Sequence, residues 1–403
     1  MIEKQLKITM ISVHSCPLGR LGEKDTGGMS IYVRELARQL GEQGHLIDVY
    51  TRVHDTRGVE VTELGENSRL IHIRAGESKE MHKLRLYPHL NEFAHNMEEF
   101  RKLNAAEYDL IHSHYWLSGW IGALGQRWWG APHCVMFHTI GAVKNDMKVG
   151  QSEPKLRLQT ERYLANNCRR IIAATTHERD QLVQYYAAAP ENIGVVPCGV
   201  NLELFKPMDK SAARLHFNLN GEKVLLYVGR MDPLKGVENL LHATRALKEY
   251  FPIKLVAVGG GDQSQPELKR LRKLSAELQI EDSVSFMGSM RQEELPPLYN
   301  AADVCVVPSY YESFGLVALE SLACGTPVVA SRVGGISNVV RDGETGYILE
   351  ENRPQFLTET IAKLFSNQSP CMNSAELIRE TVEGFSWSRI AENMLPEYEE
   401  MLC

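Results

Sequence analysis

The sequence predicts an α/β protein with two doubly wound parallel sheets that face each other across a cleft. Three observations support this fold: a length of 403 residues, alternating strand-like and helix-like segments from end to end, and a strand-free polar stretch at 208–221. A chain of this length is expected to form two units of about 200 residues each. Alternating strands and helices are typical of parallel sheets that helices cover on both faces.

Apolar and β-branched runs mark the expected strands, and helical periodicity marks the segments between them. In the first half, strands are expected near residues 7–13, 46–51, 69–74, 109–113, 133–138, 170–174 and 193–196, with helices near 28–43, 88–104, 117–128, 153–167 and 176–188. In the second half, strands are expected near 223–228, 253–258, 284–287, 303–307 and 327–330, with helices near 236–250, 266–278, 292–301, 315–323 and 335–341.

The boundary between the units is expected between Pro197 and Asn220, where Cys198-Gly199-Val200-Asn201 leaves the strand expected near 193–196. We therefore predict an N-terminal unit of residues 1–200 and a C-terminal unit of residues 201–385, with a last helix at 386–403 packed back on the first unit. In such proteins ligands bind where the carboxyl ends of strands from both units face the shared cleft. The loops that directly follow strands are therefore the informative ones.

Composition excludes several classes of protein. A formal net charge of -7 argues against nucleic acid or an anionic membrane as the main partner. No apolar run approaches the about 18 residues of a membrane span, and no signal-peptide pattern opens the chain. The eight cysteines are scattered without a C-x-x-C pair, which suits reduced thiols. We predict a soluble cytoplasmic protein with no transmembrane segment; the oligomeric state stays open, with a homodimer among the alternatives.

The loop after the first strand ends in Gly27-Gly28, which opens an amphipathic helix. Paired glycines at a helix start let backbone N–H groups approach an anion, and the helix dipole favours negative charge there. The plain alternative is a tight turn that caps the helix. Neither a G-x-G-x-x-G fingerprint nor the Gly-Lys of a P-loop occurs in the chain, so the usual dinucleotide and P-loop sites are excluded.

Two loops of the second half carry further candidates. In G-R-M-D-P-L-K-G, Arg230 and Lys235 lie five apart and could neutralise charge on a leaving diphosphate, although solvated loops carry such cations too. The triple glycine that begins at Gly259 leaves room for a ligand to approach the backbone. Glu312 and Glu320 lie on either side of a helix start near Gly315. If they do not simply face solvent, one carboxylate can accept from a sugar hydroxyl and the other from a ribose hydroxyl, with a diphosphate on the N–H groups between them.

This pattern resembles the retaining glycosyltransferases of family four, which have two Rossmann-like domains in the arrangement called GT-B. Glu312 and Glu320 match the E-x7-E motif of that family, and D-T-G-G-M and G-R-M-D-P-L-K-G match its other motifs. The resemblance extends through Gly325–Ala330, Val333–Gly335 and Gly343–Gly346. It implies catalytic roles for His138, Arg230, Lys235 and Glu312, and donor binding by Gly28, Gly259, Arg291, Phe314, Gly315, Leu316, Val317 and Glu320.

Within the family, H-S-H-Y-W-L-S-G at 112–119 and F-H-T-I-G-A-V-K-N at 137–145 resemble the inositol-phosphate glycosyltransferases of mycothiol synthesis and, more distantly, sucrose-phosphate synthases. This resemblance implies an acceptor-binding first unit and a donor-binding second unit. The residues that it assigns to the acceptor phosphate are Lys83, Tyr115, Thr139 and Arg157. Ser30 stands where the family has asparagine, at a position expected to touch the acceptor, and therefore leaves the acceptor's identity open.

The expected activity is transfer of a hexosyl group from UDP-glucose or UDP-N-acetylglucosamine to a small phosphorylated acceptor such as inositol phosphate, with fructose 6-phosphate as the alternative. The resemblance implies retention through front-face substitution, without a cofactor. A metal is not expected, because no D-x-D motif occurs and a zinc pair at His112 and His114 lacks a third ligand at suitable spacing. An epimerase would not need the acceptor-phosphate residues, and a non-catalytic binding module would not need Arg230 and Lys235.

Overall fold

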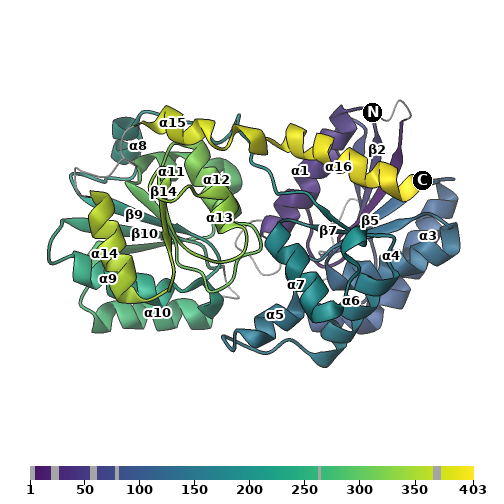
Figure 1. The fold of residues 1–403 in the computed structure, drawn as a ribbon, viewed down its shortest axis with the longest axis horizontal. Helices are drawn as coiled ribbons and strands as arrows, with labels where there is room; N and C mark the ends of the chain where they lie inside the picture. The colour runs from purple at the N-terminus through teal and green to yellow at the C-terminus, as the bar shows by residue number, and fades with distance from the viewer. Residues whose placement is uncertain (1–4, 20–26, 55–60, 78–80, 262–264, 366–373) are drawn as a thin grey trace.

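The computed structural model describes residues 5–19, 27–54, 61–77, 81–261, 265–365 and 374–403. They form two lobes that lie side by side, each organised around one sheet (Figure 1). The first sheet has eight strands in the order β3-β4-β2-β1-β5-β6-β7-β8, and the second has six in the order β11-β10-β9-β12-β13-β14. Every described pairing is parallel except that of β3 with β4. The predicted fold class is confirmed.

The first lobe contains the elements up to residue 195. Its strands are β1 (Lys7–Ile11), β2 (Leu46–Arg52), β3 (Val61–Gly65), β4 (Ser68–Ile73), β5 (Leu110–His114), β6 (His133–Met136), β7 (Arg170–Ala173) and β8 (Ile193–Val195). Its α-helices are α1 (Gly28–Glu42), α2 (Lys83–Leu86), α3 (Leu90–Leu103), α4 (Tyr115–Trp129), α5 (Gly141–Asp146), α6 (Lys155–Asn167) and α7 (Thr176–Tyr186). Strands β5, β6 and β7 are buried at every residue, as expected for central parallel strands covered on both faces.

The second lobe repeats this arrangement on a smaller sheet. Its strands are β9 (Lys223–Val228), β10 (Ile253–Val258), β11 (Val284–Gly288), β12 (Val304–Val307), β13 (Val328–Ser331) and β14 (Gly346–Leu349). Its α-helices are α8 (Lys210–His216), α9 (Val237–Leu247), α10 (Gln265–Glu277), α11 (Pro296–Ala301), α12 (Leu316–Ala323), α13 (Ile336–Val339), α14 (Pro354–Phe365) and α15 (Ala375–Glu380). Among the described residues, no helix combines the length and apolar character needed to cross a bilayer.

Two strands of the structure are absent from the sequence prediction. Strand β3 lies at the edge of the first sheet and pairs only with β4, and none of its residues is buried. An edge strand of this kind has no hydrophobic run to mark it. Strand β14 has four residues and begins with Gly346, whose φ of 157° lies outside the range that side chains favour.

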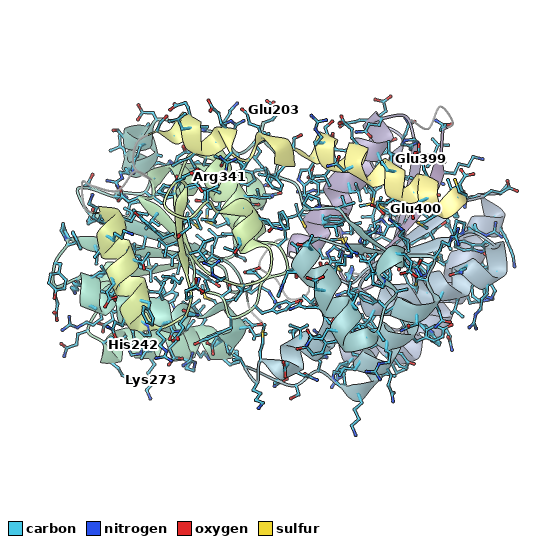
Figure 2. All side chains as sticks on the ribbon, in the orientation of Figure 1. Glu203, His242, Lys273, Arg341, Glu399 and Glu400 are labelled. Atoms are coloured by element: carbon cyan, nitrogen blue, oxygen red, sulfur yellow. The ribbon has the colours of Figure 1, made fainter. Side chains whose placement is uncertain are left out.

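The chain crosses between the lobes twice. It leaves the first lobe after β8 and returns through α16 (Trp387–Leu402), which packs on the first lobe beside α1 (Figure 1). The two crossings meet where the backbone N–H of Val200 donates to the carbonyl of Phe385 at 2.8 Å. Near the other end of α16, Glu400 pairs with Arg170 of β7 at 2.7 Å (Figure 2). Tyr398 contacts His112 of β5 at 2.8 Å.

Candidate active site

A cavity of about 340 Å³ lies between the lobes. The first lobe lines it with loops that follow β1, β5 and β6, and the second with loops that follow β9, β10, β11 and β12. The carboxyl ends of parallel strands from both sheets therefore converge on one space, which is where α/β proteins bind ligands. The predicted site residues that line it are Gly28, Lys83, Tyr115, His138, Thr139, Arg230, Lys235, Gly259, Glu312, Phe314, Gly315, Leu316, Val317 and Glu320.

The N-terminus of α12 opens into this cavity. Its N-cap is Gly315, with φ of 102°, a conformation that side chains rarely adopt. A Cβ at this position would also lie 2.6 Å from Ile336 Cδ1. The first backbone N–H groups of a helix have no partner within it, and the helix dipole adds positive potential there. The arrangement can hold a diphosphate or another anion.

A cation and a carboxylate lie beside that helix end. The Nζ of Lys235 is 2.5 Å from Oε1 of Glu312, which also accepts from the Ser309 hydroxyl at 2.9 Å. Lys235 ends a short 3-10 helix, η3 (Pro233–Lys235), and the next residue, Gly236, lies so close to the Pro308 carbonyl that a Cβ would clash with it. The turn that carries the cation is thus fixed against the loop after β12. Arg230, the second predicted cation, is half exposed at the rim.

Glu320 is buried one turn into α12, and both of its oxygens are engaged. The amide of Gln292 donates to Oε1 at 2.8 Å and the hydroxyl of Tyr299 donates to Oε2 at 2.7 Å. On the other side, Gln292 accepts from Arg34 of α1 at 2.7 Å, so the chain of contacts crosses from one lobe to the other. Burial raises the pKa of Glu320 to about 7. Since each carboxylate oxygen has two lone pairs, Glu320 can still accept from a ligand hydroxyl.

Replacing Glu320 with glutamine is expected to flatten the pH dependence of stability. A carboxyl group whose pKa is raised in the folded state binds its proton more tightly there, so it lowers stability as pH rises through the window from 4.5 to about 7. Glu178, whose pKa burial also raises to about 7, adds to the same slope. The thermal midpoint of the ligand-free protein should therefore fall less between about pH 5 and pH 7.5 in Glu320→Gln than in the natural protein.

The control for this measurement is Glu359→Gln, which changes an exposed glutamate of α14. It should leave the slope of the thermal midpoint against pH unchanged. An identical slope in Glu320→Gln and in the natural protein would contradict the raised pKa.

Two residues of the first lobe line the cavity with strained backbone. Tyr115 directly follows β5 and His138 lies two residues after the end of β6, and their φ values are 77° and 59°. Positive φ in a bulky residue costs about 1–3 kcal/mol and persists where the surrounding structure requires it, often at functional sites. The strain turns both side chains toward the cavity at adjacent strand ends.

Arg157 lies behind this surface and not on it. It is fully buried and contacts Glu161 at 2.6 Å, Glu153 at 2.8 Å, and the carbonyl and hydroxyl of Thr139 at 2.7 and 2.8 Å. Its guanidinium stacks 4.7 Å from the centre of the Tyr115 ring. Burial opposes the charge of Glu153, yet Arg157 and the neighbouring lysines hold the pKa of Glu153 at about 2. Arg157 thus supports Tyr115 and Thr139 from below.

Ser30 and Arg291 are the other predicted residues that do not line the cavity. Ser30 is buried, and its hydroxyl contacts that of Ser15 at 2.6 Å, so Ser15 presents the pair to the cavity. Arg291 is exposed, 3.4 Å from Glu294, although its neighbours Ser289 and Met290 reach the cavity wall. Asp25 and Thr26 of the D-T-G-G-M motif lie outside the described residues.

Sequence reasoning missed several lining residues. Lys144 is one of them: its Nζ is 2.5 Å from Glu153, and it lies six residues after His138 within a segment already singled out. His14 is another, directly after the first strand, with its ring 4.5 Å from that of Tyr115. Position after the first strand was the available signal for His14, and the segment 137–145 already singled out was the signal for Lys144. Within the described residues no cluster of three or more His, Cys, Asp or Glu has the arrangement of a metal site.

Comparison with known proteins identifies two family domains. Residues 26–204 match the model of Glycosyltransferase Family 4, and residues 210–381 match that of Glycosyl transferases group 1. D-inositol 3-phosphate glycosyltransferase of Corynebacterium efficiens is 36% identical over 98% of this chain and 95% of its own length. That of Mycobacteroides abscessus is 37% identical over 98% of this chain and 89% of its own.

Solved structures agree with these relatives. Sucrose-phosphate synthase from Thermosynechococcus elongatus has a TM-score of 0.92 and 34% identity, with 98% of each chain covered. WaaG, a glycosyltransferase of lipopolysaccharide biosynthesis, shares the fold at a TM-score of 0.72 and 18% identity, covering 96% of this chain and 99% of its own. With relatives above 30% identity along nearly its whole length, the chain belongs to glycosyltransferase family 4 and is a transferase of the GT-B fold.

Proposed function

We propose that this glycosyltransferase moves a hexosyl group from UDP-glucose or UDP-N-acetylglucosamine to a small phosphorylated acceptor such as inositol phosphate, with retention of configuration. One observation carries the proposal: the cavity has two separate sets of groups that suit phosphate, one from each lobe. Arg230, Lys235 and the start of α12 form the set of the second lobe. Lys144 and Lys83, whose Nζ lies 5.8 Å from the centre of the Tyr115 ring, form the set of the first lobe.

The second set suits the donor. The N–H groups at the start of α12 and the two cations would hold the diphosphate, Glu312 would accept from a sugar hydroxyl and Glu320 from the ribose. In the proposed front-face substitution the acceptor oxygen bonds to the anomeric carbon on the side that the leaving phosphate departs from. The acceptor proton then passes to that phosphate oxygen, so no protein nucleophile is needed.

The first set suits the acceptor phosphate. Lys83, Lys144 and Arg157 all act to lower the pKa of the Glu153 carboxyl, so three cations gather around it on this side of the cavity. Lys83 and Lys144 also line the cavity, where their positive charge would attract the phosphate of an acceptor. We therefore assign acceptor binding to residues 1–200 with the helix at 386–403, and donor binding to residues 201–385, in a cytosolic enzyme.

Replacing Lys83 or Lys144 with alanine is expected to raise the acceptor KM tenfold or more, about 1.5–3 kcal/mol, because each removes a charge-assisted hydrogen bond to the phosphate. Donor affinity should hardly change. The effect should largely disappear with a dephosphorylated acceptor, which forms a double-mutant cycle between side chain and phosphate. Lys155→Ala, an exposed lysine at the start of α6, is the control. Equal impairment of both acceptors would rule out phosphate recognition.

The donor and acceptor are identified by a screen. UDP-glucose, UDP-N-acetylglucosamine and GDP-mannose are each combined with inositol phosphate, fructose 6-phosphate and glucose 6-phosphate, and release of nucleoside diphosphate is measured. Fructose 6-phosphate is the second candidate acceptor because the sucrose-phosphate synthase is 34% identical over nearly the whole chain. Conversion of a UDP-sugar to its epimer without any acceptor would overturn the proposal.

Excess EDTA is expected to leave activity within a factor of about two, since Arg230, Lys235 and the α12 N-terminus supply the positive potential that a divalent ion would otherwise provide. The measurement is the initial rate before and after chelation, with a Mg²⁺ add-back. Loss of activity that Mg²⁺ or Mn²⁺ restores would contradict these roles.

A further inference from the structure

Two histidine rings meet at the cavity wall, where His138 lines the cavity and His114 lies behind it. His114 ends β5 and His138 follows β6, and the two strands are neighbours in the first sheet. Nδ1 of His114 lies 3.0 Å from Nε2 of His138. At this distance one nitrogen carries a proton and donates it, and the other accepts with its lone pair. Which ring donates decides what His138 offers to a ligand.

The other ring nitrogen of His114 indicates which of the two rings donates the hydrogen bond. Its Nε2 is buried and has no hydrogen-bond partner among the described residues. A buried backbone N–H without an acceptor is rarer in proteins than a buried carbonyl without a donor, and we take a buried ring N–H to follow the same preference. His114 is therefore more stable with its proton on Nδ1 and a bare lone pair on Nε2. Its Nδ1–H then donates to Nε2 of His138.

This arrangement fixes the proton of His138 on its other nitrogen. We propose that His114 is a positioning residue that holds His138 as the Nδ1–H tautomer, so that His138 presents a neutral N–H donor to the ligand. His138 lines the cavity, and Nδ1 is the ring nitrogen left over once Nε2 has accepted from His114. The inference rests on the proposed function only for the identity of that ligand.

The surroundings keep both rings neutral and in place. Burial lowers the pKa of His138 to about 3 and that of His114 well below its usual value. The ring of His112 lies 4.2 Å from that of His114, but its Nδ1 is engaged by the Tyr398 hydroxyl at 2.8 Å and does not compete for the same contact. The left-handed backbone of His138 is one more sign that its orientation is imposed.

The assignment has a chemical consequence. A neutral imidazole with its proton on Nδ1 can donate to a sugar or acceptor oxygen, but it cannot take a proton at that nitrogen. His138 would therefore orient a substrate oxygen and not act as a general base. The acceptor proton would have to go to another atom, and the departing phosphate oxygen is the group that the proposed reaction supplies.

The test is the protonation state of His138 in the natural protein. The protein is labelled with ¹⁵N-histidine, and two-bond proton–nitrogen correlation spectra are recorded between about pH 6 and pH 8, where the ring stays neutral. The signals of His138 are assigned by their loss in His138→Gln. A proton-bearing Nδ1 and a bare Nε2 are expected. A proton on Nε2 overturns the proposal, and the result does not depend on any variant of His114.

Two variants then test the positioning role. His114→Asn keeps an N–H donor near the place of Nδ1, and His114→Phe removes it. His114→Phe is expected to lower kcat roughly 10- to 100-fold, the range for losing a hydrogen bond that orients a histidine, and to release the tautomer preference. His114→Asn should keep the Nδ1–H signal and recover most of kcat. Equal spectra for the natural protein and His114→Phe would overturn the role.

The spectra also separate this inference from the proposed function. An Nδ1–H signal from His138 without any glycosyl transfer in the substrate screen would contradict the proposed function but support the proposed tautomer of His138. Glycosyl transfer together with a proton on Nε2 of His138 would support the proposed function and contradict the proposed tautomer.

Discussion

Lys235→Ala is expected to lower kcat about 100- to 1000-fold, the loss typical of removing one preorganised donor from a developing anion. Lys235 lines the cavity next to the N-terminus of α12, where the proposed reaction builds negative charge on the leaving diphosphate. That charge is larger in the transition state than in the bound donor, so the cation stabilises the transition state more. Arg230→Ala is expected to act in the same direction from the rim of the cavity.

The control is Lys273→Ala. Lys273 extends from α10 into solvent on the lower side of the second lobe (Figure 2), and its side chain is 79% exposed. Its variant should turn over like the natural protein. The thermal midpoint of Lys235→Ala is measured as well, because Lys235 and Glu312 are each only 18% exposed and Glu312 would lose its counter-charge. A Lys235→Ala enzyme that keeps half of its turnover would remove this residue from the mechanism.

Arg157→Ala is expected to destabilise the first lobe by about 3–5 kcal/mol, the usual cost of removing one partner from a buried ion pair. Two carboxylates, Glu153 and Glu161, lie against Arg157 in the interior and would lose their main counter-charge. The resemblance to the family implied that Arg157 binds the acceptor phosphate. The structure shows a separate role for Arg157, which holds Thr139 and Tyr115 in place from behind the cavity wall.

This prediction is checked by thermal and denaturant unfolding before any kinetic comparison. Arg162→Ala is the matched control, because Arg162 lies on the same helix, α6, and is exposed. It should unfold at the natural midpoint. If Arg157→Ala is as stable as the control, the buried ion pairs of Arg157 do not stabilise the first lobe. Its kinetic effects can then be interpreted directly as effects on acceptor binding.

The contrast between Lys235 and Arg157 shows what the sequence could predict about this site. Strand periodicity places each loop after its strand, and parallel strands bring those loops to one end of a sheet. The positions of Lys235 and Glu312 follow from that rule, whereas His138 and Tyr115 were assigned through the resemblance to the family. Burial does not follow from it. Arg157 and Glu161 are spaced four apart, which indicates a pair on one helical face but not whether that face is inside.

Contacts between residues of neighbouring strands could not be predicted from the sequence either. His114 and His138 are 24 residues apart, and they meet only because β5 and β6 are neighbours in the sheet. Sheet order depends on how the whole lobe winds, which a local pattern does not report. The edge strand β3 was missed for a related reason: no residue of it is buried, so it lacks the apolar run by which a strand is recognised.

The paired crossings at Val200 and Phe385 restrict how the lobes can move. A single flexible connection would let one lobe slide, twist and swing against the other. Two connections joined by a backbone hydrogen bond of 2.8 Å limit sliding and twisting more than one connection would, because the bond ties the crossings to each other. The least restricted motion of the lobes is then a hinge rotation about the line through the two crossings. The contact between Arg34 and Gln292, which lie on opposite lobes, would break as that rotation opens the cavity. The opening and closing of the lobes should therefore follow one hinge angle, which a ligand bound between the lobes would fix.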